Sequence, residues 1–460
     1  MFVSTTGSDD GAGTPDAPVK TLAEAIQLAV TKEDETARRV YACAETFEEA
    51  VTVTAGVTIF GGLDCKANWR WDGEKRTILT TSPGVVPLTM RAVGDTVRLE
   101  DVHIFAPEID AGDAGKSAIA AIADRCKVAL VRCTVEAGDA APGASGAPSP
   151  AQREPGHDGT PGNDACSAET VSTAAPLPND CGTPDTSDDS LGGRAGNGFL
   201  DRGGIALSGS PGEATNPNAG NYDAATTTCS NGGPGRNGDP GEPGAAGRGI
   251  GQLSSMGYAG VHGRDGKNGQ TAQGGGGGGG ARGNYSCPLA NNGGASGGNG
   301  GAGGCGGAGG KGGFPGGSSI ALLSLNAKLT FREVLLIAGN GGEGGDGSEG
   351  QTGGQGGRGG SGGMRGRDVN GALIDGMRDG CTGGMGGQGG TGGRGGGGQG
   401  GHSLGIAFQG TPDTLPSLDG ATFRLGDPGP GGTGSSGQNG DTGQASEMLD
   451  FSSPQRAPAP

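Results

Sequence analysis

Cysteine is the residue type whose number and spacing point most directly to chemistry in this chain. Ten cysteines in a glycine-rich sequence predict disulfide bonds and an oxidising compartment, since intracellular thiols are kept reduced. No two have the Cys-x-x-Cys spacing of zinc and redox motifs. Free buried thiols are the alternative. The disulfide candidates form sequential couples, the simplest of many connectivities: Cys43 and Cys65, Cys126 and Cys133, Cys166 and Cys181, Cys229 and Cys287, and Cys305 and Cys381.

A second set of residues carries charges that could act on a polysaccharide. Hydrolysis of a glycosidic bond needs two carboxyl groups close together, and elimination needs Ca²⁺ with a basic residue. Charges on solvent-facing strands are commonly only solvated, so we expect no catalytic residue here. The candidates that an enzyme would have to use are Asp95, Arg98, Asp101, Asp124, Arg125 and Arg132.

Potential metal ligands do not form a recognisable site. Residues 341–349 partly match the calcium nonapeptide Gly-Gly-x-Gly-x-Asp-x-U-x, but Ser348 stands where a large apolar residue is required. In a helix of three residues per turn, Glu343, Asp346 and Glu349 would lie about 9 Å apart, too far to share one ion. We therefore predict no metal and no cofactor. The four histidines are dispersed, at His103, His157, His262 and His402.

Several stretches of the chain consist of glycine triplets. Residues 297–314, 341–364 and 383–397 have glycine at every third position and commonly a second glycine beside it. A period of three fits neither an α-helix nor a β-strand, but it fits the polyproline-II helix. Glycine on two of the three edges would let such helices pack backbone to backbone. We predict packed polyglycine-II segments, because a flexible linker has no reason to keep a period.

Collagen also has glycine at every third position. It needs much more proline, whereas this chain has 27 prolines in 460 residues. Residues 232–249 and 260–271 do resemble collagen, but they are short and interrupted. We expect them to form the same left-handed segments with longer side chains.

The overall amino-acid composition limits the size of the core and the kind of partner. With 109 glycines, 31% hydrophobic and 3% aromatic residues, the chain cannot build one large core, so any core is narrow and repetitive. The net charge of −17 argues against a nucleic-acid partner. No apolar run approaches membrane-spanning length.

The first sixty residues show a helix followed by short strands. Thr21 and Glu24 form a capping box ahead of apolar residues at helical spacing, predicting a helix over 21–29. The chain begins directly at a strand-like Phe2, which predicts a mature form with an added initiator methionine. Alternating runs follow at residues 40–43, 50–53 and 57–60. A short helix that covers a ladder of short strands is typical of the start of a β-solenoid.

One series of residues in this region carries a family resemblance: Val3, Ser4, Gly7, Ser8, Asp9, Gly13, Thr14, Ala17, Pro18, Thr21, Leu22, Ala25, Ile26 and residues 57–62. With this series, residues 2–64 resemble the right-handed parallel β-helix proteins of the pectate-lyase-like superfamily. That resemblance implies the fold and says little about activity, since the fold hosts enzymes, adhesins and structural proteins. The Asn-x-Asp, Asp-Asp and His-Gly series of polygalacturonases is absent.

Strand-like runs and triplet runs then alternate along the chain. We predict an all-β fold: a right-handed parallel β-helix with inserted polyglycine-II segments lying against its side. The expected parts are a cap and β-helix at 1–137, a Gly/Pro-rich insertion at 138–318, further rungs at 319–428 with a polyglycine-II loop at 339–401, and a mobile tail at 429–460. The alternation resembles glycine-rich surface proteins of myxobacterial-type bacteria, and the triplets resemble the tips of phage tail-fibre adhesins.

These features together predict a secreted or cell-surface protein with a structural or adhesive role and no catalysis. Its expected partner is a surface polysaccharide or a protein. Two alternatives remain: a carbohydrate-active enzyme, and an ice-binding protein, which would need a regular Thr or Ala face that the outward Met, Gln, Arg, Lys and Asp residues do not provide.

Overall fold

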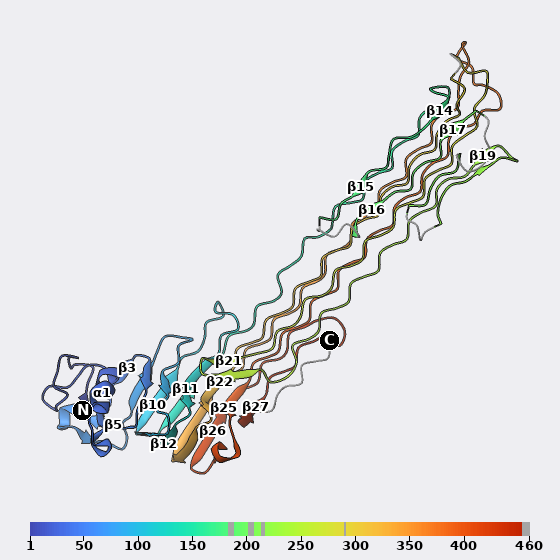
Figure 1. Ribbon diagram of the computed structural model, residues 1–460. Helices are drawn as coiled ribbons and strands as arrows, with labels where there is room; N and C mark the ends of the chain where they lie inside the picture. Colours follow the sequence, from blue (N-terminus) through green and yellow to red (C-terminus); the bar gives the residue numbers. More distant parts are fainter. Residues whose placement is uncertain (183–187, 201–206, 213–216, 289–290, 453–460) are drawn as a thin grey trace.

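The computed structural model describes residues 1–182, 188–200, 207–212, 217–288 and 291–452. It consists of a three-sided parallel β-solenoid, from which a long bundle of extended segments projects (Figure 1). The predicted fold class is therefore confirmed.

Three parallel sheets form the sides of the solenoid, and each complete turn, or rung, contributes one strand to each sheet. The first sheet contains β1 (Phe2–Val3), β2 (Arg39–Cys43), β5 (Val57–Asp64), β9 (Thr96–Glu100), β12 (Lys127–Val131) and β23 (Lys328–Arg332). The second contains β3 (Thr46–Glu48), β7 (Thr77–Thr80), β10 (Val102–Ala106), β13 (Thr134–Ala137), β24 (Val334–Ala338) and β26 (Ala421–Leu425). The third contains β4 (Val51–Val53), β8 (Leu88–Met90), β11 (Ala118–Asp124), β22 (Ser319–Leu325), β25 (Ser403–Gln409) and β27 (Ala445–Asp450).

The predicted helix closes the N-terminal end of the solenoid. Helix α1 (Leu22–Val30) begins after Thr21, whose side chain accepts a hydrogen bond from the Glu24 amide. Its buried residues, Leu22, Ala25, Ile26 and Ala29, join the apolar interior of the first rungs. The prediction over residues 21–29 is confirmed, and the cap shields the core from water.

The middle strands of the third sheet, β11, β22 and β25, are buried on both faces, which explains their unusually apolar sequences. Every residue of β11 and β22 is buried. The hairpin of β20 (Gln252–Ser254) and β21 (Gly257–Ala259), which belongs to the long insertion, contributes Leu253 and Tyr258 to the apolar cluster over its outer side. Phe451 joins the same cluster.

All three long excursions leave the solenoid at one corner, between the second and third sheets. Residues 138–318 connect β13 to β22, residues 339–402 connect β24 to β25, and residues 426–444 connect β26 to β27. Because strands of successive rungs pair in register about 4.8 Å apart, their corners stack, and the excursions emerge side by side.

Hydrogen bonds with a period of three hold the excursions together. The amides of Gly342, Gly345 and Ser348 donate to the carbonyls of Gly317, Phe314 and Lys311, and this antiparallel pattern continues to Gly363. The collagen-like residues take part as well, since Gly238 donates to Gln388. These segments are the predicted polyglycine-II helices. At about 3.1 Å per residue, residues 293–317 span roughly 75 Å.

Two expectations about the arrangement need correction. The polyglycine-II bundle does not lie against the side of the solenoid but projects away from it (Figure 1). Residues 429–444 are not a mobile tail, because Gly429 and Gly432 donate to Gly401 and Gly398 in the bundle. Strand β27 then extends the third sheet. Residues 453–460 lie outside the described residues.

Short antiparallel hairpins and turns complete the chain. β14 (Thr170–Val171) pairs with β17 (Gly198–Phe199), β15 (Pro178–Asn179) with β16 (Ser190–Leu191), and β18 (Tyr222–Asp223) with β19 (Thr228–Cys229). β6 (Arg70–Trp71) pairs with β5, and the 3₁₀ turns among the described residues include η1 (Glu35–Ala37), η2 (Cys65–Ala67) and η6 (Pro412–Thr414).

Candidate functional site at the tip of the bundle

Disulfides fasten the far half of the bundle. Cys166 is joined to Cys287 and Cys229 to Cys381, while the pair Cys181 and Cys305 lies further down the bundle. Sequential pairing is wrong for these six cysteines. The physical reason is that hydrogen bonding places segments more than a hundred residues apart side by side, so the nearest cysteine in space is not the nearest in sequence.

Two cysteines carry no disulfide although they are near neighbours in sequence. Cys126 and Cys133 are buried free thiols at opposite ends of β12. A five-residue strand separates them by more than about 15 Å, far beyond the reach of a disulfide. Burial raises the pKa of each thiol to about 11, so neither is a reactive thiolate at neutral pH.

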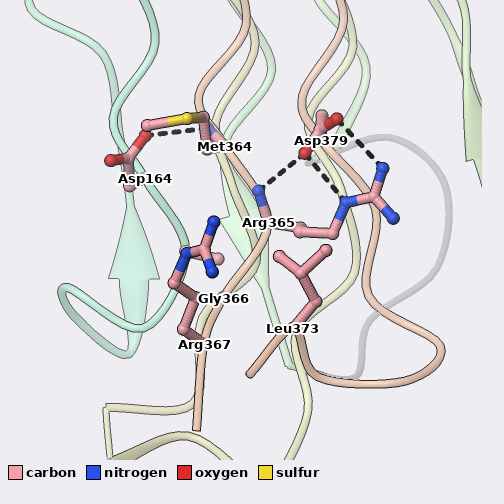
Figure 2. Close-up of a pocket in the computed structure, with 8 residues that line it drawn as sticks. Asp164, Met364, Arg365, Gly366, Arg367, Leu373 and Asp379 are labelled. Carbon is pink, nitrogen blue, oxygen red and sulfur yellow. Dashed lines mark hydrogen bonds and ion pairs between the residues drawn. The ribbon is translucent and has the colours of Figure 1, made fainter. Parts of the chain in front are cut away.

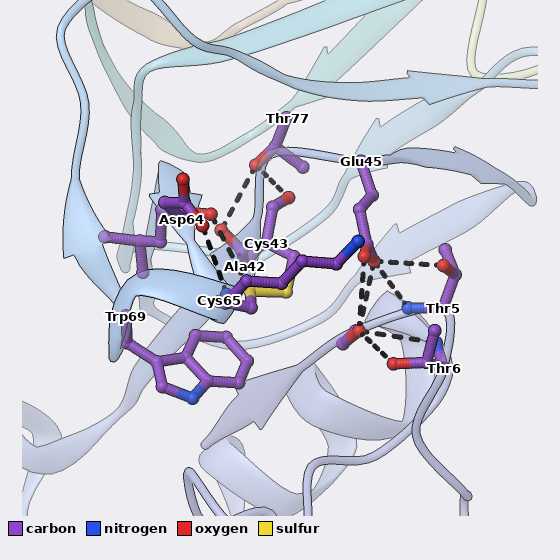
Figure 3. Close-up of a disulfide and its surroundings, with 12 residues drawn as sticks. Thr5, Thr6, Ala42, Cys43, Glu45, Asp64, Cys65, Trp69 and Thr77 are labelled. Carbon is purple, nitrogen blue, oxygen red and sulfur yellow. Dashed lines mark hydrogen bonds between the residues drawn. A yellow bond between two sulfur atoms is a disulfide. The ribbon is translucent and has the colours of Figure 1, made fainter.

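The remaining pair, Cys43 and Cys65, follows the sequential expectation (Figure 3). It ties the start of the loop between β5 and β7 to β2. Thr77 reinforces the junction, because its hydroxyl donates to the carbonyl of Cys43 at 2.7 Å. The Asp64 carboxylate caps η2 by accepting from the Ala67 amide. The loop that follows carries both tryptophans of the chain.

At the tip, residues 366–379 form a loop with a small apolar base. Ile374 and Met377 are buried against the disulfide of Cys166 and Cys287. The Asn284 side chain donates to the Asp375 carbonyl, which joins this loop to the neighbouring one. The bundle thus presents loops that are held by packing and a covalent link rather than by the glycine repeat.

A shallow hollow of ≈ 320 Å³ opens at this tip (Figure 2). Arg365 donates from its amide and guanidinium to Asp379 at 2.8 and 3.2 Å, and hydrogen bonds from Arg365 lower the pKa of that carboxyl. Asp164 accepts from the Met364 amide at 2.7 Å. Arg367 donates to the Gly371 carbonyl. Two carboxylates and two guanidinium groups make the hollow charge-balanced.

Large apolar side chains of the tip loops remain exposed, and two of them, Met364 and Leu373, line this hollow. The exposed fractions are 83% for Val369, 76% for Tyr285 and 64% for Met364, and Leu373 is half exposed. Exposed apolar groups of this size on a small, braced surface are typical of a contact site. Sequence reasoning did not identify these residues; the interruption of the triplets after Met364 marks where the loop lies, and nothing local indicates its neighbours.

The candidate carboxylates on the rungs do not form one site. Asp101 contacts Arg132 at 2.6 Å at the corner between the first and second sheets. Asp124 contacts Arg125 at 2.9 Å at the corner between the third and first. Asp95 accepts from the Gly56 amide. The structure therefore pairs the acids with nearby donors, and separates Asp101 from Asp124 by the length of a strand.

The histidines and the acidic segment 341–349 also make contacts that support the fold. His103 contacts Glu136 at 2.9 Å, and His262 packs edge-on against Phe314. His402 is buried at the base of the bundle. Asp346 accepts from the Thr433 amide and hydroxyl. Within the described residues, no group of three or more His, Cys, Asp or Glu side chains could hold a metal ion.

Comparison of the chain with protein-family models, curated proteins and solved structures found no match. In the part of the chain that the structure describes, no helix is long and apolar enough to cross a membrane. The four disulfides indicate an oxidising environment.

Proposed function

We propose that this chain is a secreted, non-enzymatic adhesive or structural protein of a cell surface. In this proposal the solenoid is the base, the polyglycine-II bundle is a spacer, and the tip loops make contact with a surface polysaccharide or a protein. The observation that carries the proposal is the placement of the braced, apolar tip at the end of a projecting bundle (Figure 1).

The bundle has the properties of a stiff spacer. Its segments are hydrogen bonded to several neighbours through the backbone; Gly345, for example, donates to Phe314 while its own carbonyl accepts from Gly398. Bending would have to break many of these bonds together, because each segment is bonded to parallel and to antiparallel neighbours: Gly304 donates to Gly387 on a parallel segment, and Gly354 donates to Cys305 on an antiparallel one. The Cys181–Cys305 disulfide links two of the segments covalently.

The tip is suited to binding rather than turnover. Its apolar groups supply area that releases water on contact, and the ion pair of Arg365 and Asp379 supplies polar groups that fix orientation. Its loops are held in place before binding, which reduces the entropy that contact must overcome. The paired acids of the solenoid favour this role over the alternative of a carbohydrate-active enzyme.

A surface-binding experiment tests the proposal. The full chain would be immobilised and exposed to a panel of purified bacterial envelope polysaccharides and extracellular proteins. A variant with Tyr285→Ser, Val369→Ser and Leu373→Ser should lose at least about tenfold in affinity for the panel member that binds, since central apolar groups dominate such contacts.

Met385→Ser is the matched control, because Met385 is exposed on the shaft instead of the tip. It should bind like the wild type. Equal binding by the tip variant would refute the role of the tip. Release of reducing or unsaturated sugar ends during incubation would refute the absence of catalysis.

A further inference from the structure

A column of aromatic rings lies on the outer face of the first sheet, far from the tip. Phe2, Tyr41 and Phe60 occupy matching positions on β1, β2 and β5. The ring centroids of Phe2 and Tyr41 are 4.9 Å apart, and those of Tyr41 and Phe60 are 5.4 Å apart, with nearly parallel planes. Trp69 packs edge-on against Phe2. In a chain with 3% aromatic residues, such a concentration needs an explanation.

The column stops at Phe60, and a hollow begins there. The next residue in register, on β9, is Glu100. One face of the Phe60 ring is stacked on Tyr41, so its other face points toward the position where a fourth ring would lie. The hollow at this position has a volume of ≈ 290 Å³ and is lined by Tyr41, Phe60, Gly61, Leu63, Trp71, Glu100, Asp101 and Arg132.

The wall that carries Trp71 is held rigidly. Trp71 pairs with Leu63 as part of β6, and the Cys43–Cys65 disulfide anchors the start of its loop. The indole N–H of Trp71 donates to Asp101 at 3.0 Å. Even so, 53% of Trp71 remains exposed. The hollow is therefore formed in advance, with apolar surface open to solvent.

The charged residues of the wall are matched with one another. Arg132 donates to Asp101 at 2.6 Å and to Glu100 at 3.1 Å, and Arg98 donates to Glu100 at 2.7 Å. The Arg132 guanidinium also lies 5.5 Å from the centroid of the Trp71 ring. The wall thus offers hydrogen-bond donors and acceptors without an unpaired charge for an ionic ligand.

We propose that this hollow binds one hexopyranose ring of a neutral glycan. The apolar face of the sugar would stack on Phe60 and beside Trp71, and its hydroxyl groups would hydrogen bond to Glu100 and Arg132. A flat apolar wall combined with a few fixed polar groups is what orients a small ligand in a site. The volume suits a single ring rather than a larger compound.

The other ligand classes fit this hollow less well. The face of an indole ring attracts cations, but at Trp71 the guanidinium of Arg132 already lies near the ring and would repel a cationic ligand. An anionic ligand would meet Glu100 and Asp101. A purely aromatic ligand, such as a tyrosine side chain, would leave most of the polar wall without partners. This inference concerns the base of the molecule and does not depend on the proposed role of the tip.

Tryptophan fluorescence tests the inference directly, because both tryptophans of the chain lie at this face. The full chain would be titrated with neutral polysaccharides and then with methyl hexopyranosides as competitors. We expect a polysaccharide to change the emission and the matching methyl glycoside to reverse it at millimolar concentration. Trp71→Ala should weaken binding at least about tenfold, and Trp71→Phe, which keeps an aromatic ring, should retain most of it.

Tyr285→Ala, at the exposed tip, is the matched control and should bind the glycan like the wild type. Melting temperatures close to that of the wild type would show that the variants fold. The inference is overturned if no neutral sugar changes the emission, or if Trp71→Ala binds as tightly as the wild type. It is also overturned if N-acetyl-tyrosinamide, and not a sugar, occupies the hollow. Loss of tip binding with intact sugar binding would instead affect only the proposed function.

Discussion

Gly389 touches Cys305 so closely that a β-carbon at position 389 would overlap the Cys305 carbonyl oxygen. The amide of Gly389 meanwhile donates to the Gly354 carbonyl at 2.9 Å, so one glycine is in contact with two neighbouring segments. Nothing larger than hydrogen fits on that edge. The same restriction recurs at most glycines of the triplets, which explains why these positions of the repeat must be glycine.

Gly389→Val should therefore destabilise the protein by about 2–3 kcal/mol, because the bundle must separate locally to admit the side chain. Gln388→Val changes the preceding residue, whose side chain is exposed, and should shift stability by less than about 0.5 kcal/mol. Thermal melts of both variants and the wild type provide the measurement. Three equal melting temperatures would contradict the packed-bundle geometry.

Unreduced, denatured protein should contain two alkylatable thiols, at Cys126 and Cys133. Peptide mapping should recover the links 43–65, 166–287, 181–305 and 229–381. In the folded protein both thiols should react slowly, because burial raises their pKa and blocks access. A link between Cys166 and Cys181 would rule out the arrangement of segments at the tip.

Replacing both Cys229 and Cys381 with serine should lower the free energy of unfolding by about 3–5 kcal/mol, because this link closes the longest loop of the four. The Cys43–Cys65 disulfide closes a much shorter loop, so replacing both of its cysteines with serine should lower the free energy of unfolding by less. Chemical denaturation of the two double variants compares them. A larger loss for the shorter link would show that local strain or packing, and not loop closure, sets the effect.

Asp101→Ala should lower the free energy of unfolding by about 3 kcal/mol, because it removes the closest partner of Arg132 and the acceptor of the Trp71 indole. The Asp101 side chain is only 3% exposed, so water cannot replace it as a partner. Asp10→Ala removes an exposed carboxylate and serves as the control. Urea denaturation at neutral pH measures both. If the two variants had equal stability, the ion pair would contribute nothing to the solenoid corner.

His402 should make stability depend on pH. It is buried and neutral: its Nδ1 accepts from the Gln444 amide at 2.8 Å, and its Nε2 donates to the Ile250 carbonyl at 3.0 Å. Burial lowers its pKa below the usual value near 6.5. The unfolded state thus binds a proton more readily, so the stabilisation is complete above about pH 6.5 and is lost as pH falls below it.

Melting temperatures between pH 7.5 and pH 5 should show this loss for the wild type. His402→Gln should be less stable overall, but its dependence on pH across that interval should be shallower, since the titrating group is gone. Identical slopes in the two proteins would assign the pH dependence to other groups.

The sequence alone predicts the interactions between residues that are close together in the chain. The glycine period predicts close packing because a β-carbon is excluded wherever two backbones touch, and the capping box at Thr21 with alternating strands predicts the capped solenoid. The sequence does not predict which segments lie side by side in the bundle, because the glycine-triplet segments are nearly alike and each could pair with any of the others. The stacked corner of the solenoid places residues 138–165 beside 339–366, and the hydrogen bonds of Asn163 with Ser296 and of Cys166 with Gly293 bring Cys166 to Cys287. The aromatic hollow also depends on the tertiary structure. Tyr41, Phe60 and Trp71 come from three strands and Arg132 from the turn after β12, and only the register of the rungs brings them together.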